Sequence, residues 1–159
     1  MTNISITTHP TGRSPENKYF FGKQAEQLDL SRPKFNKIGK GEDFANFYAL
    51  LQSQKNYLEP MNFETVGTNF TLYTNDERHK QFVWNMFKVT AEDQHGDWTI
   101  YHNTSIQMEP KIYVHLDKKL LLIAGTTFLG EIKKGVFGIV SFELPRYDIL
   151  PMHCGAFSY

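Results

Sequence analysis

The sequence predicts an α+β fold, in which one domain spanning residues 1–159 contains a mixed β-sheet packed by about three helices. Strand-like and helix-like apolar patterns alternate along the chain, without repeats, linkers or low-complexity segments. The run from Leu120 to Ala124 is apolar on both faces, which is typical of a strand covered on both sides. A length of 159 residues fits a single domain with its own core.

The first forty residues are predicted to be mainly loop and turn, because they are polar and rich in Gly, Pro, Lys and Asn. One short strand is expected near Tyr19 to Phe21. A helix is predicted over residues 42–55, where apolar side chains recur with helical spacing at Phe44, Phe47, Tyr48 and Leu51. Strands are then expected over residues 57–64 and 70–73.

A second helix is predicted over residues 76–88. The order Thr74-Asn75-Asp76-Glu77 matches a capping box, in which the Thr74 hydroxyl accepts a hydrogen bond from the backbone N–H of Glu77. The pattern directs Phe82, Val83, Met86 and Phe87 toward the core, with Trp84 nearer the flank of the helix.

The last third of the chain completes the sheet. Strands are expected over residues 98–101, 111–116 and 120–126. A buried helix ending before Pro145 follows, and residues 149–154 are expected to return as a strand. The apolar positions that define this helix are Ile132, Val136, Phe137, Ile139 and Val140.

Composition excludes several classes of function. Lys plus Arg and Asp plus Glu both number 17, so no excess positive charge attracts nucleic acid or an anionic membrane. The single cysteine, Cys154, excludes an internal disulfide framework and a multi-thiolate zinc site. Met1 to Pro10 has no apolar core of the kind a signal peptide needs. We expect a cytoplasmic protein without nucleic-acid or membrane partners.

Gly125 and Gly130 have the spacing of the outer glycines in a phosphate-binding P-loop. That motif continues with Lys and then Ser or Thr, whereas Glu131 and Ile132 stand there. No other segment has the P-loop pattern, so no nucleotide is expected as a cofactor.

Lys133 and Lys134 lie near the predicted start of the last helix, where the helix dipole disfavours cations. Their mutual repulsion favours a neutral amine that could bind a metal or move a proton. The alternative is a pair of solvated surface lysines.

Two further positions are open to a functional or a structural interpretation. Arg13, in the turn Thr11 to Pro15, could clamp a carboxylate or phosphate, or belong to an ordinary polar turn. His153 could be a metal ligand or a hydrogen-bonded core residue.

Five segments in order resemble the amino-terminal domain of the ATP-type phosphoenolpyruvate carboxykinases. The resembling segments are Thr11-Gly12-Arg13-Ser14-Pro15, Asn85-Met86-Phe87, Gly125 to Phe137 with its Gly-Glu-x-Lys-Lys-Gly core, Leu144-Pro145, and Met152 to Ala156.

The resemblance implies roles for individual residues. It implies that Arg13 binds the carboxylate or phosphoryl end of the substrate, and that Lys133 contacts substrate and transferring phosphate. It places Lys134 and His153 as ligands of a catalytic Mn²⁺ or Mg²⁺, and Ser14 and Gly130 among the substrate-binding positions.

The sequence departs from the family pattern at the site. Phe128 stands at the position of a substrate-contacting tyrosine, Thr127 replaces a tryptophan, Leu129 a glycine and Gly155 a serine. Loss of the tyrosine hydroxyl removes a polar contact that would select the substrate. The sequence also ends before the family's P-loop domain, so we expect no phosphoryl transfer from this chain alone.

Three functions remain open at this point. The first is a nucleotide-independent lyase of the decarboxylase type, acting on a small keto acid, dicarboxylate or phosphorylated acid through Arg13, Lys133 and a metal. The second is a non-catalytic module that binds such a metabolite. The third is one subunit of a split carboxykinase, completed by a P-loop partner; a homo-oligomer is a further possible assembly.

Overall fold

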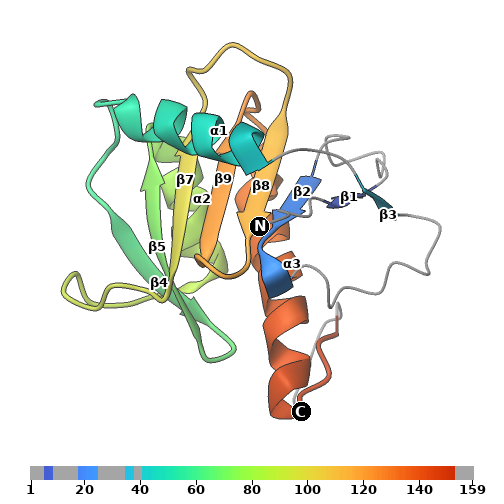
Figure 1. Ribbon diagram of the computed structural model, residues 1–159. Coiled ribbons are helices and arrows are strands. Elements are labelled where there is room, and N and C mark those ends of the chain that lie inside the picture. The colour runs from blue at the N-terminus through green and yellow to red at the C-terminus, as the bar shows by residue number, and fades with distance from the viewer. Residues whose placement is uncertain (1–5, 9–17, 25–34, 38–40, 153–159) are drawn as a thin grey trace.

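A mixed β-sheet runs through the molecule, with helix α1 on one face and helices α2 and α3 on the other (Figure 1). The computed structural model describes residues 6–8, 18–24, 35–37 and 41–152. These residues confirm the predicted α+β class with a mixed sheet and three α-helices.

The sheet has nine strands among the described residues, in the order β3-β1-β2-β8-β9-β7-β5-β4-β6. The pairs β2–β8, β9–β7 and β7–β5 are parallel, and the other neighbouring pairs are antiparallel. The strands are β1 (Ile6–Thr8), β2 (Lys18–Phe21), β3 (Phe35–Lys37), β4 (Met61–Thr65), β5 (Thr68–Thr74), β6 (Lys88–Val89), β7 (Trp98–Asn103), β8 (Lys111–His115) and β9 (Leu120–Ala124).

Strand β9 lies in the middle of the sheet and is buried along its whole length. Leu121 and Ile123 join the core beneath α2 and α3. The alternate residues Leu120, Leu122 and Ala124 join the core beneath α1. This alternation confirms the prediction that the Leu120 to Ala124 run is covered on both faces.

Helices α1 (Gly41–Ser53) and α3 (Gly130–Glu143) cover the two faces of the sheet. In α1, Phe44, Phe47 and Leu51 are buried, as their helical spacing predicts. Helix α3 approaches the sheet closely at Gly135, where an added Cβ would lie 2.6 Å from Cδ2 of Leu121. The short 3₁₀ helix η2 (Leu144–Tyr147) follows α3. No helix among the described residues combines the length and the apolar character that crossing a membrane requires.

Helix α2 (Glu77–Met86) starts differently from the prediction. Asp76 is its N-cap and accepts a hydrogen bond from the backbone N–H of Arg78 at 2.9 Å. The Thr74 hydroxyl instead lies 2.9 Å from Nδ1 of His102 and accepts the Asp76 N–H. The predicted Thr74–Glu77 capping box is therefore wrong, because Thr74 is the buried last residue of β5.

Two apolar residues predicted for the core are partly exposed. Met86 is 39% exposed and Phe137 is 40% exposed, while Val83 and Ile139 carry the contacts of their helices with the core. The helical repeat of 3.6 residues directs only a stripe of each helix toward the sheet, so apolar residues beside that stripe reach solvent.

Several strand limits also differ from the prediction. Residues 57–60 precede β4 instead of belonging to it, and residues 149–152 do not form a strand; residues 153–154 of that predicted strand lie outside the described residues. The described part of the first forty residues contains three strands, whereas one was predicted. Strands β1 and β3 escaped prediction because backbone pairing with β2 and with each other needs no apolar alternation.

The β4–β5 hairpin has a strained turn. Val66 and Gly67, its two central residues, have φ angles of 48° and 75°, as in a type I′ turn that favours Asn-Gly. A β-branched side chain is disfavoured in this conformation. Because Val66 is 60% exposed, the packing of its side chain compensates for little of this strain.

Replacing Val66 by Asn should therefore raise the free energy of unfolding by about 1 kcal/mol, because Asn tolerates the left-handed conformation. Urea denaturation measures this change. Val66→Ala is the control, since it removes the branched side chain without supplying a residue that favours positive φ. An equal gain in both variants would contradict the assignment of strain to this turn.

Candidate functional site

The carboxyl ends of three mutually parallel strands, β5, β7 and β9, meet at one edge of the sheet. Thr74 of β5 pairs with His102 of β7, and Asn103 of β7 pairs with Ala124 of β9. The segment 125–129 leaves β9 at this edge and leads into α3. In open α/β sheets ligands bind outside the carboxyl ends of the strands, which makes this segment the candidate site.

Gly125 makes the turn out of β9 possible. Its φ is +74°, and a Cβ there would lie 2.5 Å from the carbonyl oxygen of Met108. Only glycine fits both this conformation and this close approach. After the turn, the backbone N–H of Phe128 donates to Thr126 Oγ1 at 3.1 Å, and the N–H of Glu131 donates to the Phe128 carbonyl at 3.1 Å.

Lys134 is held between a carboxylate and an aromatic ring. Its Nζ lies 3.2 Å from Oε1 of Glu131 and 4.5 Å from the centre of the Phe128 ring. The Glu131 side chain is completely buried, whereas that of Lys134 is 27% exposed. A role for Lys134 as a metal ligand would require it to leave this ion pair with Glu131.

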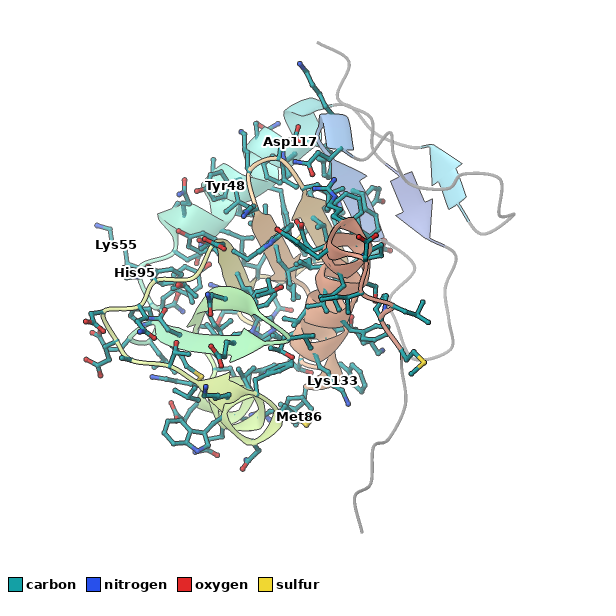
Figure 2. The ribbon with its side chains drawn as sticks, turned by 90° about the horizontal axis from the view of Figure 1, so that it is seen from below. Tyr48, Lys55, Met86, His95, Asp117 and Lys133 are labelled. Carbon is teal, nitrogen blue, oxygen red and sulfur yellow. The ribbon has the colours of Figure 1, made fainter. Side chains whose placement is uncertain are left out.

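Lys133 has a different environment, although it is the next residue. It is exposed at the start of α3 and makes no ion pair among the described residues. Figure 2 shows its side chain on the outside of the molecule. Glu131 therefore compensates one of the two lysines, and Lys133 has no such carboxylate partner in the described part of the chain.

Phe128 and Gly130 shape the surface beside the lysines. Phe128 is 49% exposed, and a Cβ on Gly130 would lie 2.7 Å from its ring. Glycine at residue 130 thus leaves room for the ring that covers Lys134. No side chain caps α3, because its N-cap residue is Leu129. The backbone N–H of Glu131 in the first turn is bonded to the Phe128 carbonyl, and Ile132 is buried.

Two buried histidines beneath the segment were not predicted as site residues. His79 of α2 and His102 of β7 are both 0% exposed, and their ring centroids are 4.3 Å apart. Asp76 Oδ2 lies 3.4 Å from His79 Nδ1. Hydrogen bonds from Arg78 lower the pKa of Asp76 to about 2. The sequence signal for His79 was its i, i+3 spacing from Asp76; His102 had none beyond its place in an apolar strand.

Burial keeps both imidazoles neutral. It lowers the pKa of His102 to about 3, and repulsion from His79 adds to the effect. Burial also lowers the pKa of His79, against the attraction of Asp76. The two side chains therefore act at neutral pH as hydrogen-bonding groups without charge.

Comparison with known proteins agrees with the motifs at this site. The family model described as phosphoenolpyruvate carboxykinase matches residues 2–158. The chain belongs to the phosphoenolpyruvate carboxykinase family. One curated relative is the phosphoenolpyruvate carboxykinase (ATP) of Deinococcus radiodurans, which is 28% identical over 96% of this chain and 37% of its own length. Another is the enzyme of Bacillus velezensis, which is 30% identical over 92% of this chain and 32% of its own length. A third, from Lysinibacillus sphaericus, is 30% identical over 92% of this chain and 32% of its own length. The chain thus spans about a third of the length of these relatives.

The structure brings together part of the site that the carboxykinase resemblance implies. Phe128, Gly130, Lys133 and Lys134 lie on the segment before α3 and on its first turns. Arg13, Ser14 and His153 lie outside the described residues, so their convergence on this site stays a prediction.

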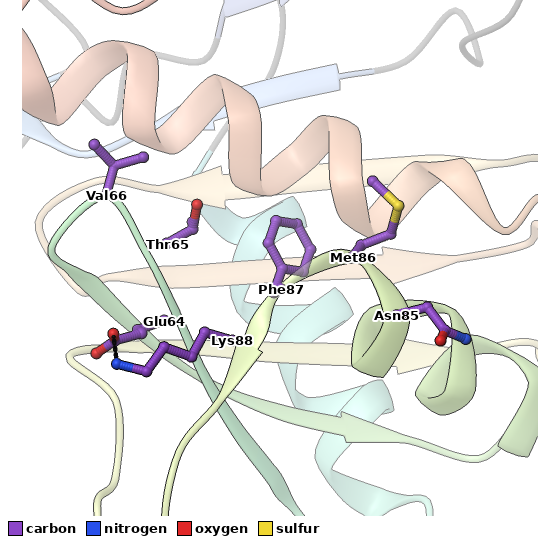
Figure 3. A pocket seen from close by; sticks show the side chains of 7 residues that line it. All are labelled: Glu64, Thr65, Val66, Asn85, Met86, Phe87 and Lys88. Atoms are coloured by element: carbon purple, nitrogen blue, oxygen red, sulfur yellow. Dashed lines mark hydrogen bonds and ion pairs between the residues drawn. The ribbon is translucent and has the colours of Figure 1, made fainter. Parts of the chain in front are cut away.

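Another carboxykinase-like segment, Asn85-Met86-Phe87, has a structural explanation. Phe87 stacks on Phe63 of β4 with ring centroids 4.9 Å apart and packs against the core. All three residues line an open groove of about 390 Å³ between the end of α2 and the β4–β5 hairpin, where Lys88 pairs with Glu64 (Figure 3).

The described residues do not by themselves form a metal site. They contain no group of three His, Cys, Asp or Glu side chains placed to hold a metal ion. Of the two predicted ligands, Lys134 is paired with Glu131 and His153 lies outside the described residues.

Stability should fall as the pH drops below the ordinary histidine pKa of about 6.5. An unfolded chain binds a proton there, whereas folded His102 does not until about pH 3, so the unfolded state binds more protons. Between pH 7 and pH 5, His102 should account for a loss of about 2 kcal/mol in the free energy of unfolding.

Urea denaturation of wild type and His102→Asn at pH 7 and pH 5 measures how much of this loss in the free energy of unfolding is due to His102. The variant should lose the His102 component of the pH dependence, while His95→Asn, at an exposed turn histidine, should keep it. An unchanged pH dependence in His102→Asn would show that the buried imidazole is not responsible.

Proposed function

We propose that this chain binds a small keto acid, dicarboxylate or phosphorylated acid at the start of α3 and decarboxylates the keto acid without a nucleotide. The observation that carries the proposal is the difference in environment between Lys133 and Lys134. Glu131 compensates Lys134, and Lys133 remains exposed beside a helix start that no side chain caps. Membership of the carboxykinase family supports the choice of substrate class.

The binding step uses charge and hydrogen-bond donors together. In this proposal the ammonium of Lys133 and the positive end of the α3 dipole both attract the acid. Arg13 supplies a second, bidentate contact to the acid in this proposal. The Phe128 ring and the aliphatic part of Lys134 give an apolar wall that limits the water around the bound acid.

The chemistry proposed is decarboxylation of a β-keto acid. The bond between the departing carboxylate and the carbon next to the keto group breaks, and its electron pair moves through that carbon to the keto oxygen. Carbon dioxide leaves and an enolate remains. Lys133, as an ammonium, stabilises the enolate oxygen, and a proton from Lys133 or water then restores the carbon.

A divalent ion, Mn²⁺ or Mg²⁺, is a possible addition to this site. When bound, it would act as a Lewis acid toward the keto oxygen. Lys134 and His153 are the proposed ligands. To bind the ion, Lys134 would have to leave its ion pair with Glu131.

A split carboxykinase is the second candidate, because the surface at and after η2 favours a partner. Apolar side chains are exposed there, including Tyr147 at 71%, Leu150 at 79% and Met152 at 67%. A P-loop subunit covering them would supply nucleotide binding.

Purified protein incubated with oxaloacetate, without nucleotide, separates the candidates. Pyruvate release above the uncatalysed rate supports the lyase. Binding of oxaloacetate without turnover would contradict the lyase and favour a metabolite-binding module. Turnover that appears only with ATP and a P-loop chain would favour the split enzyme.

Lys133→Ala should reduce the rate of oxaloacetate decarboxylation by about 10²-fold, since one electrostatic donor to the developing oxyanion is lost. Steady-state kinetics measure this loss. Lys80→Ala, at a lysine on α2, is the matched control and should keep the wild-type rate. Equal rates in both variants would remove Lys133 from the mechanism.

Phe128→Tyr should strengthen binding of phosphoenolpyruvate about 10-fold by supplying the polar group found in the resembling family. The ring is half exposed, so its new hydroxyl can meet a ligand without being buried unpaired. Isothermal titration calorimetry measures the change, with Phe137→Tyr on α3 as the control. Unchanged affinity in Phe128→Tyr would place the ligand away from residue 128.

A further inference from the structure

The loop that follows β7 leaves the sheet at the same edge as the segment before α3. Strands β7 and β9 are parallel neighbours, so their carboxyl ends lie side by side. The loop, residues 104–110, then passes close to Gly125. A Cβ on this glycine would lie 2.5 Å from the carbonyl oxygen of Met108 and 2.7 Å from that of Glu109. The loop therefore borders the candidate site.

Asn75, the first residue after β5, ties the start of this loop to the end of its own strand. Its Oδ1 accepts hydrogen bonds from the backbone N–H of Thr104 at 2.9 Å and from the Thr104 hydroxyl at 3.3 Å. Its Nδ2 donates to Oγ of Ser105 at 2.7 Å. The backbone N–H of Ser105 in turn donates to Oδ1 of Asn103 at 2.8 Å. The Asn75 side chain thus joins the carboxyl ends of two parallel strands.

The bond from Asn75 also orients the hydroxyl group of Ser105. A serine oxygen can accept hydrogen bonds and can donate one. Because Oγ of Ser105 accepts from Asn75, its own hydrogen points away from that residue, and no acceptor for this hydrogen lies among the described residues. The Ser105 side chain is exposed. Its hydroxyl is therefore a directed donor, open to solvent, at the edge of the sheet that carries the candidate site.

Stability alone does not explain this arrangement. The bond between Asn75 and Ser105 lies at the surface, where water competes for both groups and the net contribution to folding is small. A donor that is already held in one direction, by contrast, loses little freedom when a charged oxygen binds to it. Hydrogen bonds from neutral donors to carboxylate or phosphoryl oxygens are also stronger than those between neutral groups.

We infer that Ser105 donates a hydrogen bond to the carboxylate or phosphoryl group of the bound acid, and that Asn75 is the positioning residue that directs this hydroxyl. The contact with the acid rests on the proposed function, whereas the role of Asn75 in holding the loop does not.

Ser105→Ala should weaken the binding of phosphoenolpyruvate roughly 10-fold, because a hydrogen bond to a charged group is lost. Ser105→Thr keeps the hydroxyl and should bind like wild type. The matched control is Ser53→Ala, which removes an exposed hydroxyl that bonds to the Leu50 carbonyl within α1. Isothermal titration calorimetry measures the affinity of each variant.

Two variants of Asn75 separate holding the loop from orienting the hydroxyl. Asn75→Ala removes both, and amide hydrogen exchange of Thr104 should become roughly 10-fold faster. The control Asn85→Ala, at an exposed side chain that bonds to the Gln81 carbonyl, should leave this exchange unchanged. Asn75→Asp keeps the acceptor for Thr104 but has no donor for Ser105 and attracts the hydroxyl hydrogen instead. It should keep slow Thr104 exchange and still weaken phosphoenolpyruvate binding.

The new carboxylate of Asn75→Asp also repels an acid, and a double-mutant cycle separates this effect. Repulsion persists when residue 105 is alanine, whereas the orientation of a hydroxyl does not. Asn75→Asp should therefore weaken binding at least roughly 3-fold less in the Ser105→Ala background than in wild type. Equal weakening in both backgrounds would overturn the positioning role of Asn75.

Binding of phosphoenolpyruvate by the wild-type protein tests the proposed function separately. If wild type binds and Ser105→Ala keeps the same affinity, the inferred contact is overturned and the proposed binding site stands. If wild type does not bind, the proposed function and the Ser105 contact are both rejected. Thr104 exchange still decides whether Asn75 holds the loop: faster exchange in Asn75→Ala supports this role, and unchanged exchange overturns it.

Discussion

The burial of β9 on both faces is the constraint on which the rest of the structure depends. Each of its Leu and Ile side chains stabilises the fold by about 2 kcal/mol, and successive residues contribute to different cores. Because Leu121 packs against Gly135, the position of α3 follows from the position of this strand. The carboxyl end of β9 and the start of α3 are therefore fixed relative to each other, and only the five residues between them can vary.

Polar groups are buried around this connection at a cost that ordinary packing does not explain. Glu131 has one carboxylate oxygen on Lys134 and the other without a partner among the described residues, and His79 and His102 have incomplete hydrogen bonds. Each such group costs free energy of folding in a low dielectric. Their concentration at the ends of β7, α2 and α3 distinguishes this edge of the sheet from the apolar cores on either side of β9. It agrees with the carboxykinase-like sequence of the same segment.

Much of the fold was predictable because buried residues of strands and helices are apolar and recur with a regular spacing in the sequence. The two-sided apolar run of β9 and the helical spacing of Phe44, Phe47 and Leu51 gave the sheet centre and α1 correctly. Prediction failed where an element depends on backbone pairing, or where two groups compete for the same side chain. Strands β1 and β3 pair without an apolar signature, and Thr74 bonds to His102 instead of capping α2. At the site, the resemblance gave Lys133 and Lys134 different roles, but the sequence did not show that Lys134 pairs with the buried Glu131.

The sequence by itself determined the family, the α+β class and the segment that carries the candidate site, because motifs and hydrophobic periods are local properties of the chain. Only the tertiary structure decided which of the two lysines pairs with Glu131, since this buried carboxylate contacts Lys134. It also decided that His79 and His102 lie together under the segment. They are 23 residues apart, and their contact follows from the pairing of β5 with β7 and the packing of α2 on that sheet.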